Sequence, residues 1–306
     1  MNSLSAPASP SPVASQPQDW PRISLVTPVW NSGRYIEQTI ESVLAQKYPN
    51  LEYFVIDGGS TDNTLDIIRK YEPHLTGWLS EADKGMYDAL NKGFARSTGE
   101  VMGWINASDQ LQVGGLRAVA SAFTTFPQVS WITGRPTWLN EEGITYQVGE
   151  IQRWSRWRYL AGANKYIQQE STFWKRALWE RAGGYLATNR GPVGDFDLWV
   201  RFFRYAQLYS IDALIGAYRI HKGSLGEANL AECHRTQDSI VEEELSRMPS
   251  AVWLRAFRRI WQGARHLRGV RYAWWKLVET PLYRMRGSDW PPVLRYSQDE
   301  GWRLEK

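Results

Sequence analysis

Polar side chains that could bind a cation or a nucleotide lie at the ends of three apolar segments. The three are residues 23–29 before Asn31, residues 51–56 before Asp57, and residues 100–105 before Ser108 and Asp109. Short, nearly continuous apolar runs of this kind are typical of strands buried on both faces in a parallel sheet. Because open parallel sheets bind ligands at the carboxyl ends of their strands, we expect these polar groups to converge on one crevice.

Asp109 and His221 are the candidate metal ligands. Mg²⁺ and Mn²⁺ prefer oxygen ligands and leave coordination positions open for phosphate oxygens and water, which suits a carboxylate at a strand end. The alternative is that Asp109 caps a following helix. His221 follows an apolar strand and precedes a Gly-Ser turn, and a lone histidine in such a place is often only structural or exposed.

Asp195 and Asp197 are candidates for proton transfer. A positioned carboxylate that takes a proton from a reacting hydroxyl typically contributes about 10² to 10⁴ in rate. Leu198, Trp199 and Phe202 indicate that a helix begins near these acids. Either acid could therefore simply favour the positive N-terminal end of that helix.

The elements expected to position these groups alternate along the first half of the chain. Apolar strands are expected at residues 23–29, 51–56, 75–79 and 100–105, and helices at 34–46, 62–70 and 86–96. This alternation predicts an α/β fold with a mostly parallel sheet flanked by helices. The second half adds helices at 116–126, 177–182 and 195–206, and strands at 129–134, 145–148, 166–175 and 208–219.

Composition sets limits on the class of protein. The 306 residues are 43% hydrophobic and 22% charged, with one cysteine, and no run of about eighteen apolar residues offers a membrane span. A single cysteine excludes an internal disulfide and favours a reducing compartment, so a cytoplasmic location is expected. Residues 1–19, rich in Pro, Ser and Ala, predict a disordered arm. No nucleic-acid reader motif accompanies the small basic excess.

The carboxyl-terminal residues 226–306 are expected to form a helical, basic and tryptophan-rich region. Residues 251–268 place apolar side chains on one helical face and arginines elsewhere. A basic amphipathic helix with tryptophans could lie on an anionic membrane, here through residues 251–286 at the inner face of the plasma membrane. The alternative is that its apolar face packs on the core or on a partner subunit.

Seven segments in order resemble the family 2 glycosyltransferases with the GT-A fold, many of which build bacterial polysaccharides from nucleotide sugars. The segments are residues 27–31, 57–64, 83–93, 106–109, 169–174, 195–199 and 218–221. The resemblance covers about residues 22 to 224. It implies a Rossmann-like GT-A domain at residues 20–225, followed by a C-terminal helical appendage.

The resemblance also implies roles for individual residues. Expected contacts of the nucleotide sugar are Thr27, Pro28, Val29, Asn31, Asp57, Lys84, Asn91 and Ser108. The expected donor or acceptor pocket consists of Gln169, Glu170 and Trp174. In this comparison Asp109 and His221 bind Mn²⁺ or Mg²⁺, and Asp195 is the general base of an inverting transfer. Two of these groups have plain alternatives, since Asp57 could only cap its turn and Lys84 could stay solvated.

Two positions depart from the family pattern. Ser108 replaces the acid that usually precedes Asp109, and Gly194 replaces the glutamate that usually precedes Asp195. We expect a metal-dependent, inverting transfer of a sugar from a nucleotide diphosphate sugar, with UDP as the expected nucleotide, to a lipid-linked or polysaccharide acceptor. The alternative is a catalytically impaired nucleotide-sugar or glycan-binding module. A dinucleotide-dependent oxidoreductase is disfavoured because no Gly-x-Gly-x-x-Gly turn follows the first strand.

Overall fold

The structure of the chain is a computed structural model. It describes residues 20–162, 166–221, 230–248, 252, 254–256, 258 and 291–305. The expected arm at residues 1–19 and most of the expected membrane segment at residues 251–286 lie outside the described residues.

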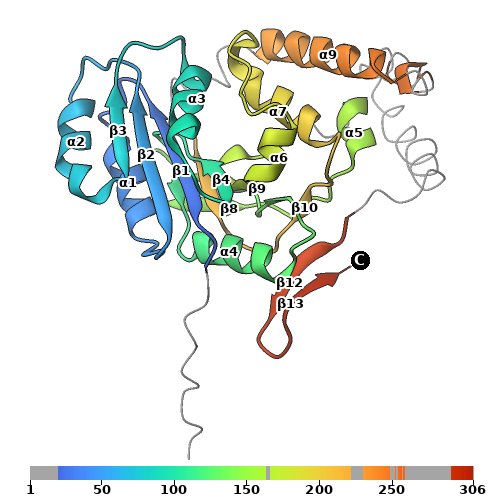
Figure 1. Cartoon of the computed structure of the whole chain (residues 1–306), viewed down its shortest axis with the longest axis horizontal. Helices are drawn as coiled ribbons and strands as arrows, with labels where there is room; N and C mark the ends of the chain where they lie inside the picture. Colours follow the sequence, from blue (N-terminus) through green and yellow to red (C-terminus); the bar gives the residue numbers. More distant parts are fainter. Residues whose placement is uncertain are drawn as a thin grey trace, which may run out of the picture.

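Strands and helices alternate through the first half, as the sequence predicts (Figure 1). They are β1 (Ile23–Val29), α1 (Ile36–Leu44), β2 (Leu51–Asp57), α2 (Thr64–Tyr71), β3 (Gly77–Ser80), α3 (Met86–Arg96) and β4 (Val101–Trp104). All seven residues of β1 are buried. Helix α1 buries Ile36, Ile40 and Val43, whose spacing places them on one face. Hydrophobic periodicity therefore determines these elements.

The second half is built from shorter elements. They are β5 (Gln110–Leu111), α4 (Gly115–Thr125), β6 (Trp131–Thr133), β7 (Thr137–Leu139), β8 (Thr145–Val148), α5 (Arg156–Ala161), the 3₁₀ turn η2 (Gln169–Ser171), β9 (Thr172–Lys175), α6 (Arg176–Arg181), the 3₁₀ turn η3 (Gly191–Val193), α7 (Gly194–Phe202), β10 (Tyr209–Ser210) and β11 (Gly216–Arg219). Two expected strands differ. The one at 166–175 begins only at Thr172, and the one at 208–219 is divided into β10 and β11, which belong to different sheets.

The central sheet has seven strands in the order β10-β6-β9-β4-β1-β2-β3. Strand β1 pairs in parallel with both β2 and β4, and β3 continues this parallel set. Only β9 runs antiparallel to its neighbours β4 and β6. The register aligns Val29, Asp57 and Ser80, so the strand ends share one edge of the sheet. The fold class is the mostly parallel α/β arrangement that the sequence predicts.

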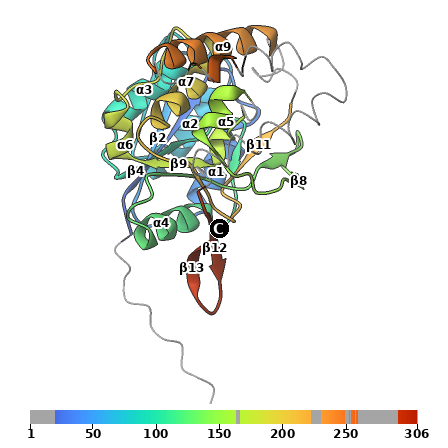
Figure 2. The same cartoon turned by 90° about the vertical axis from the view of Figure 1, so that its right-hand side faces the viewer.

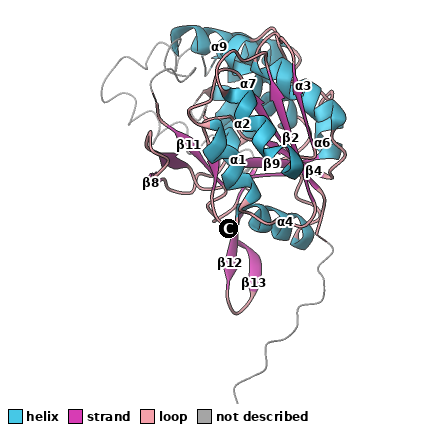
Figure 3. Ribbon diagram, turned by 90° about the vertical axis from the view of Figure 1, so that its left-hand side faces the viewer, coloured by secondary structure: helices cyan, strands magenta, loops and turns pink. Residues whose placement is uncertain are grey.

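Helices cover both faces of this sheet (Figure 3). One buried layer joins residues of β1 and β2 to α1, α2 and α4. The other joins the opposite side of the same strands to α3, α6 and α7. A second, four-stranded sheet has the order β5-β11-β7-β8; Figure 2 shows β8 and β11 standing away from the main sheet. This small sheet brings residues near 109 and 219 together.

Four tryptophans fill the centre of the second layer. Trp104, Trp131, Trp174 and Trp199 are almost completely buried. The rings of Trp104 and Trp199 stack with centroids 5.7 Å apart, and Trp174 packs edge-on against Trp104 at 5.5 Å. Offset and edge-to-face aromatic pairs are favourable beyond the area they bury. Trp174 is therefore a core residue, which corrects its expected place in a donor or acceptor pocket.

The carboxyl-terminal region packs back onto the core. Helix α9 (Leu230–Ser246) lies along α7 (Figure 1). Leu254 is buried, and Arg258 is also buried, where it donates to Asp238 at 2.5 Å. The described start of the expected membrane helix thus matches the packing alternative. The remainder of that helix lies outside the described residues.

The last described residues form a hairpin, which corrects the expectation that residues 226–306 are helical throughout. It consists of β12 (Val293–Ser297) and β13 (Gly301–Glu305). Leu294 bridges to Ile211, and the Trp302 indole donates to Ser121 at 2.9 Å. These two contacts hold the hairpin against the end of β10 and against α4. Within the described residues, no helix is long and apolar enough to cross a membrane.

Candidate active site

The turn after β2 is held together by Asp57. Its Oδ2 accepts hydrogen bonds from the backbone of Gly59 and Ser60, both at 3.0 Å, and from the Ser80 hydroxyl at 2.7 Å. The Ser60 hydroxyl donates to Oδ1. Asp57 is completely buried. These bonds match the alternative in which Asp57 caps its turn. Its carboxylate therefore stabilises the turn after β2 and is not free to bind a ligand.

The end of β1 borders the same edge through its backbone. The Thr27 hydroxyl pairs with the Tyr53 hydroxyl at 3.0 Å inside the buried layer, which leaves its side chain unable to face a ligand. Pro28 and Val29 are buried as well. Asn31 accepts a bond from the Thr61 backbone at 2.8 Å and so ties the first turn to the second. Trp30 is 67% exposed beside them.

Asp109 is completely buried and directly precedes β5 of the small sheet. The backbone N–H of Arg219 donates to its Oδ1 at 2.9 Å. Its Oδ2 is buried and accepts no hydrogen bond from the described residues. Burial raises the pKa of Asp109 to about 7, although hydrogen bonds from the Arg219 backbone and the Asn106 side chain oppose this rise. An unpartnered buried carboxylate oxygen is costly, and a cation is one partner that would satisfy it.

Arg219 lies in the segment 218–221, and its contacts give it a role that the sequence does not indicate. Its guanidinium donates to the Ser108 carbonyl at 2.6 Å, to the Glu141 carbonyl at 2.8 Å and to the Gln38 side chain at 2.7 Å. The side chain is completely buried. Arg219 thus fixes both the Asp109 carboxylate and the peptide before it. Contacts between residues 111 positions apart leave no trace in local sequence.

A divalent cation fits the chemistry of this place. Four side-chain oxygens are buried here without a partner among the described residues: Asn106 Oδ1, Asp109 Oδ2, Gln169 Oε1 and Glu170 Oε1. Oxygen is the donor that Mg²⁺ and Mn²⁺ prefer. Within the described part of the chain, however, no three His, Cys, Asp or Glu side chains lie close enough to hold a metal together. The ring of His221 packs beside that of Tyr35, with centroids 4.8 Å apart.

Glu170 and Gln169 lie on η2, between the main sheet and the small one. Gly216 of β11 is needed there, because a Cβ atom would lie 2.1 Å from the Glu170 carbonyl oxygen. Glu170 is 1% exposed. Burial raises its pKa well above the ordinary value, and the nearby charges of Asp109 and Asp195 raise it further. The structure therefore brings three carboxyl groups into one region.

A small cavity adjoins η2. Its volume of about 40 Å³ is bounded by Trp138, Trp154, Tyr166 and Gln168, among others. Since a water molecule needs roughly 10–15 Å³ measured in this way, the cavity has room for only a few waters. It is too small to be a finished sugar pocket.

Asp195 lies in the first turn of α7 and is half-buried. Its Oδ1 accepts hydrogen bonds from the Phe196 backbone at 2.7 Å and from the Tyr87 hydroxyl at 3.2 Å. Burial raises the pKa of Asp195 to about 6, and both hydrogen bonds act against that rise. A general base that operates near neutral pH needs a pKa close to this range.

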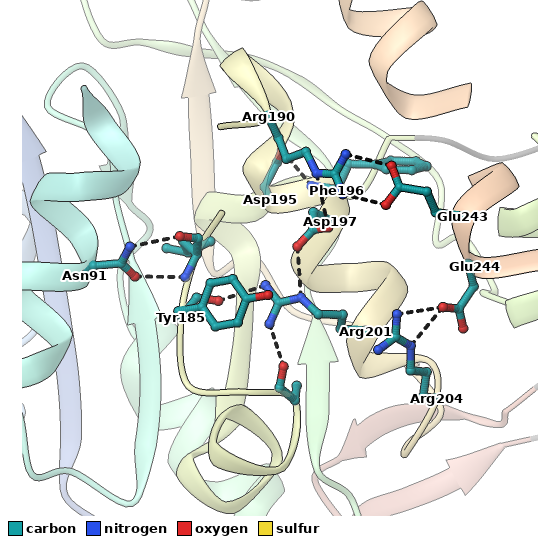
Figure 4. A network of polar contacts seen from close by, with 12 residues as sticks. Asn91, Tyr185, Arg190, Asp195, Phe196, Asp197, Arg201, Arg204, Glu243 and Glu244 are labelled. Atoms are coloured by element: carbon teal, nitrogen blue, oxygen red, sulfur yellow. Dashed lines mark hydrogen bonds and ion pairs between the residues drawn. The ribbon is translucent and has the colours of Figure 1, made fainter. Parts of the chain in front are cut away.

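The alternative base, Asp197, is already paired. Arg201 donates to its Oδ2 at 2.8 Å, as Figure 4 shows, and Arg190 lies 3.9 Å from its Oδ1. Arg190 in turn forms two bonds to Glu243 of α9, at 2.8 and 2.6 Å. Asp197 is 8% exposed. It belongs to the network that fixes α7 to its surroundings.

Two further expected contacts of the nucleotide sugar behave differently. The Asn91 amide exchanges two hydrogen bonds with the Leu186 backbone, both at 2.8 Å (Figure 4). This pairing joins α3 to the loop before α7 and leaves the amide one N–H and one lone pair, so the expected contact with the nucleotide sugar stays a prediction. Lys84 is exposed on the loop before α3, where its ammonium can still reach a ligand. The neighbouring Lys92 is paired with Glu81 at 2.9 Å.

Comparison with known proteins identifies the family of this arrangement. The family model described as glycosyl transferase family 2 matches residues 24–190, more than half of the chain. A protein of Mycobacterium tuberculosis named only as a glycosyltransferase is 31% identical over 169 residues, which cover 54% of this chain and 63% of the relative. A PGL/p-HBAD biosynthesis glycosyltransferase of Mycobacterium bovis is 33% identical over 106 residues, or 34% of this chain and 41% of that one. The chain thus spans less than two thirds of the length of these relatives.

Solved structures share the fold. The TarS protein of S. aureus in complex with UDP-GlcNAc has a TM-score of 0.56 at 19% identity, covering 75% of this chain and 73% of that one. The mannosyltransferase PcManGT of Pyrobaculum calidifontis, in complex with GDP-Man and Mn²⁺, has a TM-score of 0.53 at 18% identity, covering 90% and 84%. At these identities the likeness concerns the fold alone. It confirms the expected GT-A architecture.

Proposed function

The chain belongs to glycosyltransferase family 2, and from this membership we propose that it transfers a sugar from a nucleoside diphosphate sugar to a lipid-linked or polysaccharide acceptor. The transfer is metal-dependent and inverts the anomeric carbon. The observation that carries the proposal is the placement of Asp109 and Asp195 around Glu170, each close enough to raise the pKa of that third carboxyl. Asp109 is available to bind a cation, and Asp195 is available to accept a proton.

The donor binds along the edge where β1, β2 and β4 end. The exposed Trp30 indole offers a face on which a base can stack, and stacking of this kind is worth about 1–3 kcal/mol. The backbone of residues 27–29 and the Ser108 hydroxyl remain candidates for the base and ribose. Lys84 is the candidate cation for the diphosphate. UDP is the expected nucleotide, and the TarS complex with UDP-GlcNAc supports this choice.

Asp109 Oδ2 and His221 are the proposed ligands of Mn²⁺ or Mg²⁺. The unpartnered oxygens near Asp109 support the assignment, as does the Mn²⁺ in the PcManGT complex. When bound, such an ion neutralises charge on a departing diphosphate. Arg219 holds Asp109 so that one oxygen is occupied and the other is left for this purpose.

Asp195 is the proposed general base. Above pH of about 6 its carboxylate is charged and can accept the proton of an acceptor hydroxyl. The acceptor oxygen then forms a bond to the anomeric carbon, while the bond from that carbon to the diphosphate breaks. Because this is a single displacement from the opposite side, the product has the inverted configuration.

A donor screen tests the proposal. Thermal unfolding is followed with UDP, GDP, CDP or dTDP, each with Mn²⁺ and with EDTA, since a ligand that binds only the native state raises Tm. We expect one nucleotide to raise Tm only with Mn²⁺, and its sugar conjugates to be screened next for release of the free nucleoside diphosphate. A protein that binds the conjugate and releases nothing with any glycan or lipid-linked acceptor would be the binding module instead.

The acceptor is proposed to be presented at an anionic membrane through residues 251–286. Because the hairpin of residues 293–305 packs on the core, removing the whole carboxyl-terminal region would damage the domain. Arg265→Glu combined with Arg268→Glu reverses charge within the proposed segment alone. We expect this variant to lose co-sedimentation with phosphatidylserine vesicles, since each nearby basic residue contributes about 1 kcal/mol. Equal binding by the parent and the variant would contradict this role of residues 251–286.

A further inference from the structure

Tyr87 lies against the carboxylate of Asp195, although the two residues are 108 positions apart in the chain. The Tyr87 hydroxyl is 3.2 Å from Asp195 Oδ1 and 3.1 Å from the Pro192 carbonyl. Its single hydrogen can serve one acceptor at a time, and a charged carboxylate is the stronger of the two. When Asp195 is ionised, the hydroxyl therefore donates to Oδ1.

The two hydrogen bonds that Asp195 accepts from the described residues both end on Oδ1. The Phe196 backbone supplies one from the start of α7, and Tyr87 supplies the other from α3. Tyr87 is itself 6% exposed, so its ring has little freedom to move. Oδ2 is thereby left as the oxygen that can meet an acceptor hydroxyl.

We propose that Tyr87 is the positioning residue of Asp195: its hydroxyl fixes the orientation of the carboxylate and favours the charged form that accepts the proton. The proposal rests on the proposed function, in which Asp195 is the base. Tyr87 acts only through Asp195 and touches neither the donor nor the acceptor in this scheme. A hydrogen bond to the charged form of an acid favours that form.

Gly194 provides the space for this arrangement. A Cβ atom at position 194 would lie 2.8 Å from two ring carbons of Tyr87 and 2.9 Å from the Ala187 carbonyl oxygen. Real Cβ atoms essentially never approach other atoms this closely, so a side chain here would displace the ring. The tyrosine ring therefore packs against Gly194, the sequence position at which the resembled family usually has a glutamate. The departure at Gly194 accommodates Tyr87 and leaves Asp195 supported.

Other titratable groups also face Asp195 and must be separated from Tyr87 in any test. They are Tyr159 of α5, Glu170 of η2, Tyr166 before η2 and Cys233 of α9. Tyr159 is the useful one. Its ring stacks on Phe196 with centroids 4.9 Å apart, and its buried hydroxyl has no hydrogen-bond partner among the described residues. Tyr159→Phe is thus a matched control, which removes a hydroxyl nearby without removing a bond to Asp195.

The first experiment does not depend on turnover. The full chain is labelled with ¹³C at the aspartate carboxyl carbons, and the Asp195 resonance is assigned by its loss in Asp195→Asn. We expect its pKa to lie near 6 in the parent and about 0.5 to 1 unit higher in Tyr87→Phe, since one hydrogen bond contributes about 0.5–1.5 kcal/mol. Tyr159→Phe should leave the value unchanged. An unchanged pKa in Tyr87→Phe would overturn the proposal.

The second experiment measures transfer as a function of pH. In Tyr87→Phe we expect kcat to fall about tenfold, the KM for the donor to stay the same, and the acidic limb of kcat/KM to move up with the pKa of Asp195. A raised donor KM with normal kcat would contradict a positioning role. If Tyr87→Phe does not fold, Gly194→Ala is titrated instead. Its methyl group would lie 2.8 Å from two ring carbons of Tyr87, so we expect the ring to shift and the Asp195 pKa to rise.

The two experiments separate this proposal from the proposed function. If the Asp195 pKa rises in Tyr87→Phe but the parent has no transfer activity, the Tyr87–Asp195 relationship is retained and the enzyme function is rejected. If transfer is normal and the Asp195 pKa in Tyr87→Phe equals that of the parent, the enzyme function is retained and the positioning role of Tyr87 is rejected.

Discussion

Arg219 donates its backbone N–H to Asp109 Oδ1 at 2.9 Å, while its guanidinium holds the Ser108 carbonyl at 2.6 Å. A single residue of β11 thus fixes the carboxylate of the proposed metal site and the peptide before it. The opposite oxygen, Oδ2, is buried without a partner in the described part of the chain. A buried polar atom without a hydrogen-bond partner costs stability, and such atoms are typical of sites that bind a ligand.

Asp109→Asn should abolish metal-dependent nucleotide binding. The amide preserves shape and still accepts the bond from Arg219, but it removes the negative charge that a divalent cation requires. We expect the Kd for Mn²⁺ to rise at least tenfold and the Tm increase with UDP plus Mn²⁺ to disappear. Isothermal titration with Mn²⁺ alone measures the first effect. Metal affinity equal to that of the parent would exclude Asp109 as a ligand.

The same variant should change how stability depends on pH in EDTA. The Asp109 pKa is about 7 in the folded chain and about 3.9 in an unfolded one. A raised carboxyl pKa contributes its full stability below pH 4, and this contribution is lost as the pH rises through 7. Three pKa units correspond to a loss on the order of 4 kcal/mol. We therefore expect urea unfolding to show that the stability of Asp109→Asn, relative to that of the parent, is greater at pH 8 than at pH 4. The same stability difference at both pH values would contradict this.

Sequence reasoning located the sheet edge because strand boundaries are local properties. The apolar runs before Asp57 and Asp109 indicate buried strands, and the register confirms that β2 and β4 both pair in parallel with β1, so that both run toward the same edge of the sheet. The roles of Asn91 and Trp174 could not be read in this way. The partner of Asn91 is the Leu186 backbone, 95 positions away, and Trp174 is in the core because Trp104 and Trp199 pack around it. Side-chain pairing across the fold determines which polar or aromatic residue remains available for a ligand.

Glu244→Gln should destabilise the docking of α9 on the core. Glu244 is 3% exposed and pairs with Arg204 at 2.6 Å and with Arg156 at 3.1 Å. Removing one member of a buried ion pair leaves uncompensated charge and typically costs about 3–5 kcal/mol. Denaturant unfolding measures the loss. Glu300→Gln in the exposed pair with Arg303 is the control, and it should change stability by less than about 1 kcal/mol.

Asp195→Asn and Asp197→Asn should separate chemistry from folding. Asp195→Asn keeps the side-chain shape but removes the base, so we expect kcat to fall about 10² to 10⁴-fold with the Kd for UDP and Mn²⁺ unchanged. Asp197→Asn leaves Arg201, which is 5% exposed, without its buried counter-charge. That variant should lower Tm by several degrees while each folded molecule keeps a nearly normal kcat.

Both variants are compared at a temperature below the transition of the less stable one, with active sites counted by nucleotide binding. This count prevents loss of folded protein from being read as loss of catalysis. Normal transfer by Asp195→Asn together with lost transfer by folded Asp197→Asn would mean that Asp197, and not Asp195, is the general base. That result would also imply that Arg190 and Arg201 release Asp197 when an acceptor binds, since at present both guanidinium groups lie beside its carboxylate.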